Sequence, residues 1–168
     1  REIRKARSLA RLASVLPRIR RSVGQHLAAA EPTRDFAAAA VVELVDRSAI
    51  RPGRESYARE RGTRGAATLL KSNVTVSGGL ISLAFRSKGG KRITKRFRDA
   101  RLAAAIVRLR RLPGRRLFQY RAARGRICLL TAREVNAFLR EIAGVDIALK
   151  DFRTLFASAS VLAALARM

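Results

Sequence analysis

The spacing of apolar residues changes twice along the chain, and this change is what most limits the folds open to it. Toward both ends, apolar residues recur every three or four positions, which is typical of amphipathic helices. In the middle, short runs rich in branched and aromatic residues are separated by glycines, which is typical of strands joined by tight turns. The sequence therefore predicts an α+β fold that is mainly helical and contains a small three-stranded antiparallel sheet.

The predicted sheet lies at about residues 73–97. Its three strands are expected at 74–76, 80–85 and 93–97. Gly78-Gly79 and the segment 87–90, which holds two further glycines, separate them. Glycine supplies the positive φ that tight hairpin turns need, so two hairpins are predicted. A second, smaller hairpin is expected from 117–120 and 127–130.

Helices are expected over most of the remaining chain, at 1–30, 34–47, 55–61, 99–111, 131–144 and 148–168. Pro17 is expected to open a second helix within the first of these, because proline favours the first turn of a helix. The second is expected to face a core through Ala37, Val41, Leu44 and Val45. Thr131 and Glu134 have the spacing of a capping box, which marks a helix start.

The charge of the chain points to a polyanionic partner. Lys and Arg number 37 against 12 Asp and Glu, for a net charge of +25. The stretch 61–133 alone holds 20 basic residues and one acid, Asp99. A folded domain this basic repels itself, and phosphates neutralise it with release of counterions, so nucleic acid is the leading partner. A membrane surface is the weaker alternative, since tryptophan is absent and no apolar run approaches the roughly 18 residues of a membrane span.

Three segments carry a family resemblance: IRPGRESYARERGTRGAATLL at 50–70, FRSKGGKR at 85–92 and ALKDFRTLFASASVLAAL at 148–165. In this order and spacing they resemble the catalytic domain of type IB DNA topoisomerases of the bacterial and poxvirus kind. The stretches at 112–120 and 131–144 resemble the same family, so the likeness covers nearly the whole chain. It implies the helical catalytic core shared by these enzymes and the tyrosine recombinases.

The resemblance also implies roles for three residues. Arg51 and Arg153 would hold the non-bridging oxygens of a DNA phosphate, since a guanidinium offers paired donors and keeps its charge. Lys88, on the tip of the predicted hairpin, would give a proton to the departing 5′ oxygen. Such an enzyme relaxes supercoiled DNA through a transient 3′-phosphotyrosyl bond, and no metal and no other cofactor is expected.

Further DNA contacts are implied on the same segments, at Gly53, Tyr57, Thr68, Lys71, Arg86, Lys91 and Arg92. The chain departs from the family at Pro52, which removes a backbone N–H beside Arg51. The family's active-site histidine and nucleophilic tyrosine normally lie beyond the last helix and are expected to be absent from this chain, as is the family's small N-terminal β domain. We therefore expect one catalytic-domain fragment over 1–168 that binds double-stranded DNA as a monomer but lacks the nucleophile.

This fragment divides into a helical part at 1–50, an arginine turn with β-hairpins at 51–97, and a helical part with a small hairpin at 98–168. A tyrosine recombinase or integrase core is the first alternative, but recombinases place a His-x-x-Arg box where this chain has Lys150 three residues before Arg153. A basic DNA-binding module without activity is the second. RNA readout is disfavoured, since only 5% of the residues are aromatic. A cytoplasmic, nucleoid-associated location is expected.

Overall fold

The computed structural model describes residues 2–167, apart from the side chains of residues 161 and 162. Its helices are α1 (Glu2–Leu27), α2 (Arg34–Ser48), α3 (Glu55–Arg61), α4 (Ala100–Leu109), α5 (Ala132–Ala143) and α6 (Leu149–Ala166). Its strands are β1 (Val74–Ser77), β2 (Leu80–Arg86), β3 (Arg92–Arg98), β4 (Gln119–Arg121) and β5 (Ile127–Leu129). The predicted α+β fold, mainly helical with a three-stranded sheet, is confirmed. Among the residues described, no helix combines the length and apolar character needed to cross a bilayer.

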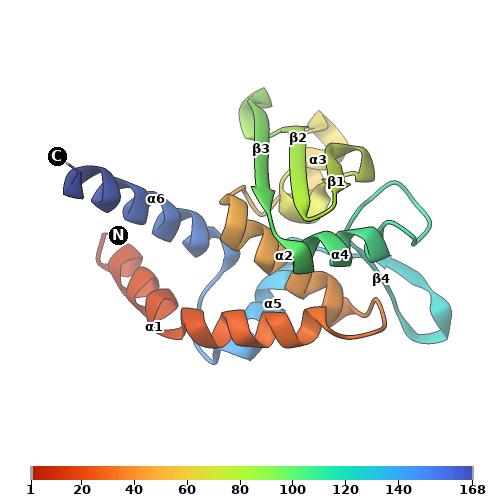
Figure 1. The fold of residues 1–168 in the computed structure, drawn as a ribbon, viewed down its shortest axis with the longest axis horizontal. Coiled ribbons are helices and arrows are strands. Elements are labelled where there is room, and N and C mark those ends of the chain that lie inside the picture. Colours follow the sequence, from red (N-terminus) through yellow and green to blue (C-terminus); the bar gives the residue numbers. More distant parts are fainter. Residues whose placement is uncertain (1, 168) are drawn as a thin grey trace.

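Helix α2 forms the centre of the core. Thr33 caps its start by accepting a hydrogen bond from the Phe36 backbone N–H at 3.2 Å. Every side chain from Phe36 to Val45 is buried, because α1, α4, α5 and α6 all pack around this helix. Figure 1 shows these helices around α2, with the sheet on one side. The run of alanines at 37–40 has no bulk on any face, so neighbouring elements approach it from all sides.

Helix α1 is continuous through Pro17, so the prediction of a second helix opening there is wrong. Proline removes one backbone hydrogen bond and crowds the preceding turn, which bends a helix. Figure 1 shows α1 changing direction about midway along its length. Leu12 before Pro17 and Ile19 and Val23 after it are all buried, so packing of one apolar face holds both halves in one helix.

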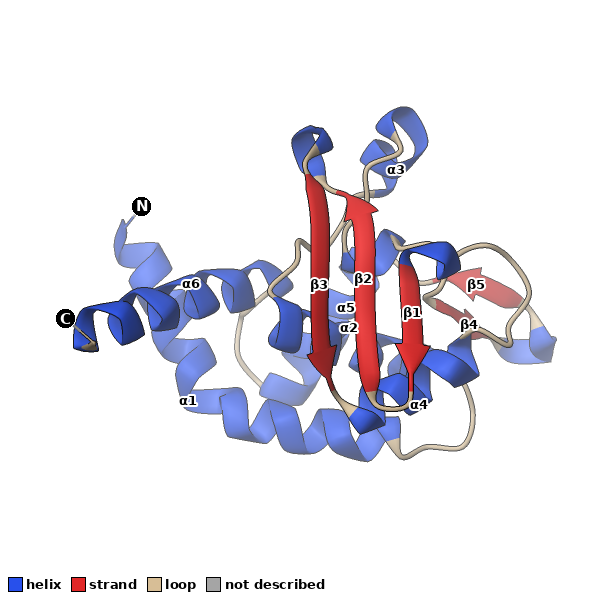
Figure 2. Cartoon of the chain, turned by 45° about the horizontal axis from the view of Figure 1, so that its top comes forward, coloured by secondary structure: helices blue, strands red, loops and turns tan. Residues whose placement is uncertain are grey.

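The three-stranded sheet has the order β1-β2-β3 with antiparallel pairing throughout. Along β2, Ile81, Leu83 and Phe85 are buried, while the alternate positions face outward. Figure 2 shows the three strands side by side, with the β2–β3 tip and α3 projecting at the same end of the sheet. The β2–β3 register ends at Arg86 and Arg92, so Lys88 lies on the tip that joins the two strands at this end of the sheet.

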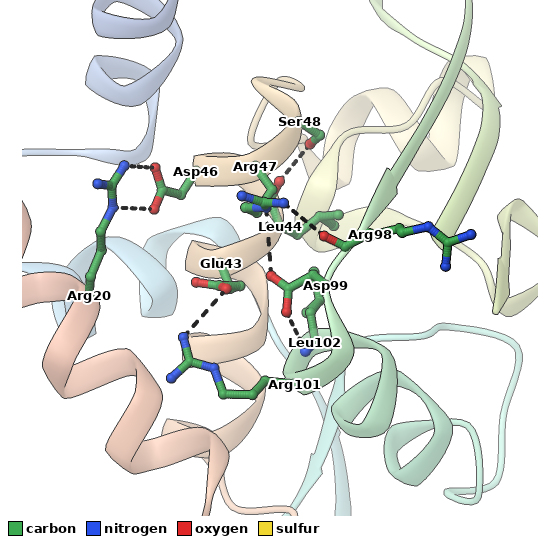
Figure 3. Close-up of polar contacts among 10 residues, drawn as sticks. All are labelled: Arg20, Glu43, Leu44, Asp46, Arg47, Ser48, Arg98, Asp99, Arg101 and Leu102. Atoms are coloured by element: carbon green, nitrogen blue, oxygen red, sulfur yellow. Dashed lines mark hydrogen bonds and ion pairs between the residues drawn. The ribbon is translucent and has the colours of Figure 1, made fainter. Parts of the chain in front are cut away.

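A charged cluster lies where α1, α2 and α4 meet (Figure 3). It contains Arg20, Glu43, Asp46, Arg47, Asp99 and Arg101. Glu43 is only 7% exposed, and burial raises its pKa to about 8. A hydrogen bond with Asp99 and the charge of Asp99 add to this rise, whereas the Arg101 guanidinium, 3.8 Å away, opposes it. Burial therefore favours the neutral form of Glu43.

Candidate functional site

A cavity of about 250 Å³ lies where the loop after α2, the start of α3, the β2–β3 tip and the start of α6 meet. Its walls are formed by Arg51, Pro52, Gly53, Arg54, Tyr57, Thr63, Arg64, Lys88, Lys150 and Arg153. Six of these ten residues are Lys or Arg, and none of them is acidic. The structure thus brings together the three residues predicted to be catalytic, although they come from segments far apart in the sequence. The cavity suits an anion.

The loop that carries Arg51 is fixed by its backbone. Ala49 ends α2 in the left-handed conformation with a φ of 58°, and its N–H donates to the Val45 carbonyl at 2.8 Å. The Arg51 carbonyl then accepts from the Ala66 N–H at 2.7 Å, and the Pro52 carbonyl accepts from the Ala67 N–H at 2.9 Å. Pro52 lacks an N–H, but its carbonyl still helps to hold the loop. The Arg51 side chain is exposed toward the cavity.

Two glycines and a threonine let this loop pack closely on the segment after α3. Gly53 has a φ of +95°, and a Cβ there would lie 2.8 Å from the Thr68 hydroxyl oxygen. A Cβ at Gly65 would lie 2.6 Å from the Arg51 carbonyl oxygen. The Thr68 hydroxyl accepts from the Gly65 N–H at 2.9 Å, and Thr68 is 1% exposed. Thr68, predicted to contact DNA, therefore supports the loop that lines the cavity and is not itself in the wall.

Arg153 is placed by the end of α2. Its Nε donates to the Ala49 carbonyl at 2.8 Å. The left-handed conformation of Ala49 sets the direction of this carbonyl and thereby the orientation of the Arg153 side chain. Burial lowers the pKa of Arg153, and the nearby positive charge of Arg51 lowers it further. Among residues 2–167, neither arginine forms an ion pair with a carboxylate. Their terminal N–H groups remain available to an anion in the cavity.

Lys88 lies on the tip that joins β2 to β3. The Ser87 N–H donates to the Lys91 carbonyl at 2.7 Å, and Gly89 and Gly90 adopt φ values of 79° and 78°. Only glycine takes up this conformation without a steric cost, so the tip depends on both. The Lys88 side chain is exposed, yet it lines the cavity.

Tyr57 lies between two arginines. The Cζ atoms of Arg54 and Arg61 are 5.3 and 5.0 Å from the centre of its ring. These distances are within the range of cation–π attraction, which orders the ring and both guanidinium groups. Tyr57 and Arg54 line the cavity, so the cluster forms part of its rim.

The other predicted DNA contacts lie outside the cavity. Arg86, Lys91 and Arg92 are exposed on the β2–β3 hairpin, and Arg86 is directly opposite Arg92 in the register. Like charges in opposed positions repel, which makes this end of the hairpin receptive to a polyanion. Lys71 is half-buried, and its ammonium donates to the Leu112 carbonyl, so its side chain is held within the protein.

Sequence reasoning missed four of the residues in the wall. Arg54, Thr63 and Arg64 lie within the segment at 50–70 that carried the resemblance, but arginine is too common here to mark a site, since the chain has 31 arginines. Lys150 had a clearer signal. It precedes Arg153 by three positions in α6, which places both on one face of the helix.

Comparisons with known proteins place the chain in a family. A family described as "Eukaryotic DNA topoisomerase I, catalytic core" matches residues 1–168. The DNA topoisomerase 1B of Acanthamoeba polyphaga mimivirus is 33% identical over 118 residues, which is 68% of this chain and 35% of the viral protein. The chain thus spans about a third of the length of that relative.

Solved structures show the same fold in another protein. The pre-cleavage complex of the XerH site-specific recombinase with its difH substrate has a TM-score of 0.54 at 13% identity, covering 87% of this chain and 41% of the recombinase. The post-cleavage complex of XerH with palindromic difH has a TM-score of 0.53 at 14% identity, covering 84% and 38%. At this identity the likeness shows a shared fold.

The comparisons also refine the expected branch of the family. The matching family is eukaryotic by its description and the relative is viral, so they give no support to the bacterial kind that the sequence suggested. By the match over residues 1–168, the chain belongs to the DNA topoisomerase I catalytic-core family.

Proposed function

We propose that the cavity binds a phosphodiester of double-stranded DNA and that the protein acts as a type IB DNA topoisomerase. It would relax supercoils by cutting one strand through a transient 3′-phosphotyrosyl bond. The observation that carries this proposal is the meeting of Arg51, Lys88 and Arg153 in one cavity that has no acidic residue in its wall. Membership of the topoisomerase I family supports it. Monomeric action and a cytoplasmic, nucleoid-associated location belong to the same proposal.

The proposed chemistry needs negative charge to be held at phosphorus. A tyrosine oxygen attacks the phosphorus, the bond to the 5′ oxygen breaks, and the non-bridging oxygens gain charge in the five-coordinate transition state. Arg153 uses Nε to contact Ala49, which leaves its two terminal nitrogens for these oxygens. Arg51 approaches from the loop after α2, and Lys88 supplies the proton that the 5′ oxygen takes up as it leaves.

Neither tyrosine of this chain fits the nucleophile. Tyr120 donates a hydrogen bond to Glu134 at 2.8 Å, and burial together with this contact raises its pKa to about 12, which disfavours the phenolate. Tyr57 lines the cavity, but the resemblance gives it a contact with a DNA phosphate. We therefore expect these 168 residues to bind DNA without forming a covalent adduct. An adduct mapped to Tyr57 or Tyr120 would contradict this assignment.

Lys150 supports the topoisomerase over the recombinase alternative. Recombinases carry histidine three residues before the second arginine, and in this chain the lysine at that position lines the cavity. An ammonium there adds another charge that can contact phosphate.

Relaxation of supercoiled plasmid, without ATP or magnesium, tests the proposal with the protein expressed from its complete reading frame. Arg153→Ala is expected to slow cleavage at least ~100-fold, the usual effect of removing one preorganised donor to a developing oxyanion. Arg153→Lys should recover only part of the rate, because an ammonium lacks the two-pronged guanidinium geometry. Arg140→Ala, an exposed change on α5, is the matched control and should have little effect.

A second measurement isolates the role of Lys88. Lys88→Ala should slow cleavage by ~10²–10⁴-fold and leave DNA affinity nearly intact. A substrate with sulfur at the 5′ leaving position needs no proton and should restore the rate. If that substrate gives no rescue, Lys88 is not the proton donor, and if Arg153→Ala cleaves normally, the proposed function is wrong.

A further inference from the structure

A second basic cavity, of about 440 Å³, adjoins the first, and Arg64 lines both. Arg59 from α3 and Arg115 and Arg116 from the loop before β4 complete a set of four arginines around it, and the buried Gln119 lies among them. Of these four, only Arg64 belongs to the first cavity. The proposed chemistry therefore leaves this cavity without a role.

The second cavity has more positive charge than the protein neutralises. Arg116 donates through both terminal nitrogens to the Glu55 carboxylate, with the first contact at 3.0 Å. Within residues 2–167, no ion pair is formed by Arg59, Arg64 or Arg115. Burial lowers the pKa of Arg64, and the positive charge of Arg116 lowers it further. The arginines around the cavity therefore repel one another, and a bound anion would reduce this repulsion.

The backbone around this cavity is held in place, unlike that of a loose surface patch. The Lys71 N–H donates to the Arg115 carbonyl at 2.8 Å, and the Leu117 N–H donates to the Leu69 carbonyl at 3.0 Å. The Gln119 amide nitrogen donates to the Arg116 carbonyl at 3.0 Å. These bonds fix the loop that carries two of the arginines. A site built before its ligand arrives loses less entropy on binding.

Arg64 links the two cavities. Its Nη1 donates to the Thr68 carbonyl at 3.0 Å, and its backbone N–H donates to the Arg86 carbonyl at 2.7 Å, so its position is fixed from two sides. Helix α3 contributes Tyr57 to the first cavity and Ala58 and Arg59 to the second. Two phosphates of one ligand, one bound in each cavity, would therefore both contact α3. A nucleic-acid strand, which repeats phosphates at short and regular intervals, has this form.

We propose that the second cavity is a phosphate-binding site, and that in the complex with DNA it holds a backbone phosphate near the one in the first cavity. Guanidinium forks match the oxygens of a phosphate, which is why arginine suits this ligand better than lysine. The DNA part rests on the proposed function, whereas the phosphate site itself does not. A free phosphate offers the same oxygens, so the test has one arm for each source.

The DNA arm compares two double variants that remove equal charge. Arg59→Gln with Arg115→Gln changes exposed residues of the cavity, and Arg4→Gln with Arg7→Gln changes exposed residues near the start of α1. Affinity for a short duplex is measured by fluorescence anisotropy over a range of salt. The cavity variant should bind roughly tenfold more weakly, and the slope of log affinity against log salt should fall by about 0.9 for each phosphate that the variant no longer neutralises. The α1 variant should keep the wild-type slope.

The free-phosphate arm titrates inorganic phosphate into the wild-type chain and the cavity variant, following the arginine Nε–Hε NMR signals. We expect saturable shifts of Arg64 and Arg116 in the wild type and none in the variant. Saturable shifts with an unchanged duplex slope would support the phosphate site and overturn its DNA role. The absence of both effects would overturn the proposal. If the wild-type chain binds no duplex at all, the proposed function fails, and the NMR titration alone decides whether this cavity binds phosphate.

Discussion

Replacing Glu43 by glutamine should remove most of one pH-dependent component of stability. Glu43 is buried where Asp46 and Arg47 of α2, Asp99 and Arg101 beside it, and Arg20 of α1 come together (Figure 3). The contact with Asp99 and the charge of Asp99 add to the effect of burial and favour its neutral form. Glutamine has nearly the same shape and offers an amide donor at the same place, so the variant reproduces the protonated state at every pH.

The sign and size of the effect follow from the raised pKa of Glu43. Its pKa is 4.5 when unperturbed and about 8 in the folded protein. The stability contributed by the neutral form is complete below the unfolded pKa and is lost as pH rises through the folded pKa. One pKa unit corresponds to about 1.4 kcal/mol, which sets an upper limit of about 5 kcal/mol. Because water and nearby arginines relax around the ionised carboxylate, we expect a loss of about 2–4 kcal/mol.

Urea unfolding at a series of pH values measures this loss. The unfolding free energy of the wild type should fall, relative to that of Glu43→Gln, between about pH 5 and pH 8, and the difference should be constant above that range. Glu141→Gln, at an exposed position, is the control and should follow the wild type. Parallel pH curves for the wild type and Glu43→Gln would show that Glu43 ionises normally and would refute the reasoning.

Three further changes test the local structure, each by urea unfolding. Gly53→Ala should cost about 2–3 kcal/mol of stability, because φ is +95° and the new Cβ would lie 2.8 Å from the Thr68 hydroxyl. Gly78→Ala, with a φ of +60° and open space around it, should cost only about 1 kcal/mol. Equal losses would contradict the close packing at Gly53. Ala49→Gly should stabilise the protein by about 0.5–1 kcal/mol, since φ there is 58°, and a loss of stability would count against strain at this position. Thr131→Ala should cost about 1 kcal/mol by removing a capping box, and an unchanged midpoint would show that the cap is dispensable.

The sequence predicted the positions of the helices and strands better than it predicted how they pack together. The strands and the Thr131 helix start were marked by glycines and by a capping box, which act locally, and the structure confirms them. Pro17 also gave a local signal, but packing of α1 along α2 outweighed it. For α2 the apolar pattern predicted one buried face, whereas the whole helix from Phe36 to Val45 is buried. Alanine is compatible with both, so only the tertiary arrangement decides.

The site was predictable where a motif was read as a whole and not where single residues were judged. The resemblance placed Arg51, Lys88 and Arg153 on three segments, and the structure brings them to one cavity. The spacing of charges could not tell which of many basic residues point outward. Lys71, predicted to contact DNA, has its ammonium bonded to a backbone carbonyl, whereas Arg64, which was not singled out, lines two cavities.

Lys88 is joined to the rest of the protein by a short tether, because the strands on both sides of its hairpin tip are hydrogen-bonded to neighbouring elements. The Lys95 ammonium donates to the Ser48 carbonyl at 2.7 Å, and the Arg86 carbonyl accepts from the Arg64 N–H at 2.7 Å, so both strands that flank the tip at 87–90 are bonded to the rest of the protein. Four residues span at most about 13 Å. An amine on so short a tether is present at the cavity at an effective concentration of roughly millimolar or more. Inserting four glycines into the tip would dilute it roughly threefold, because effective concentration falls as about the −3/2 power of tether length.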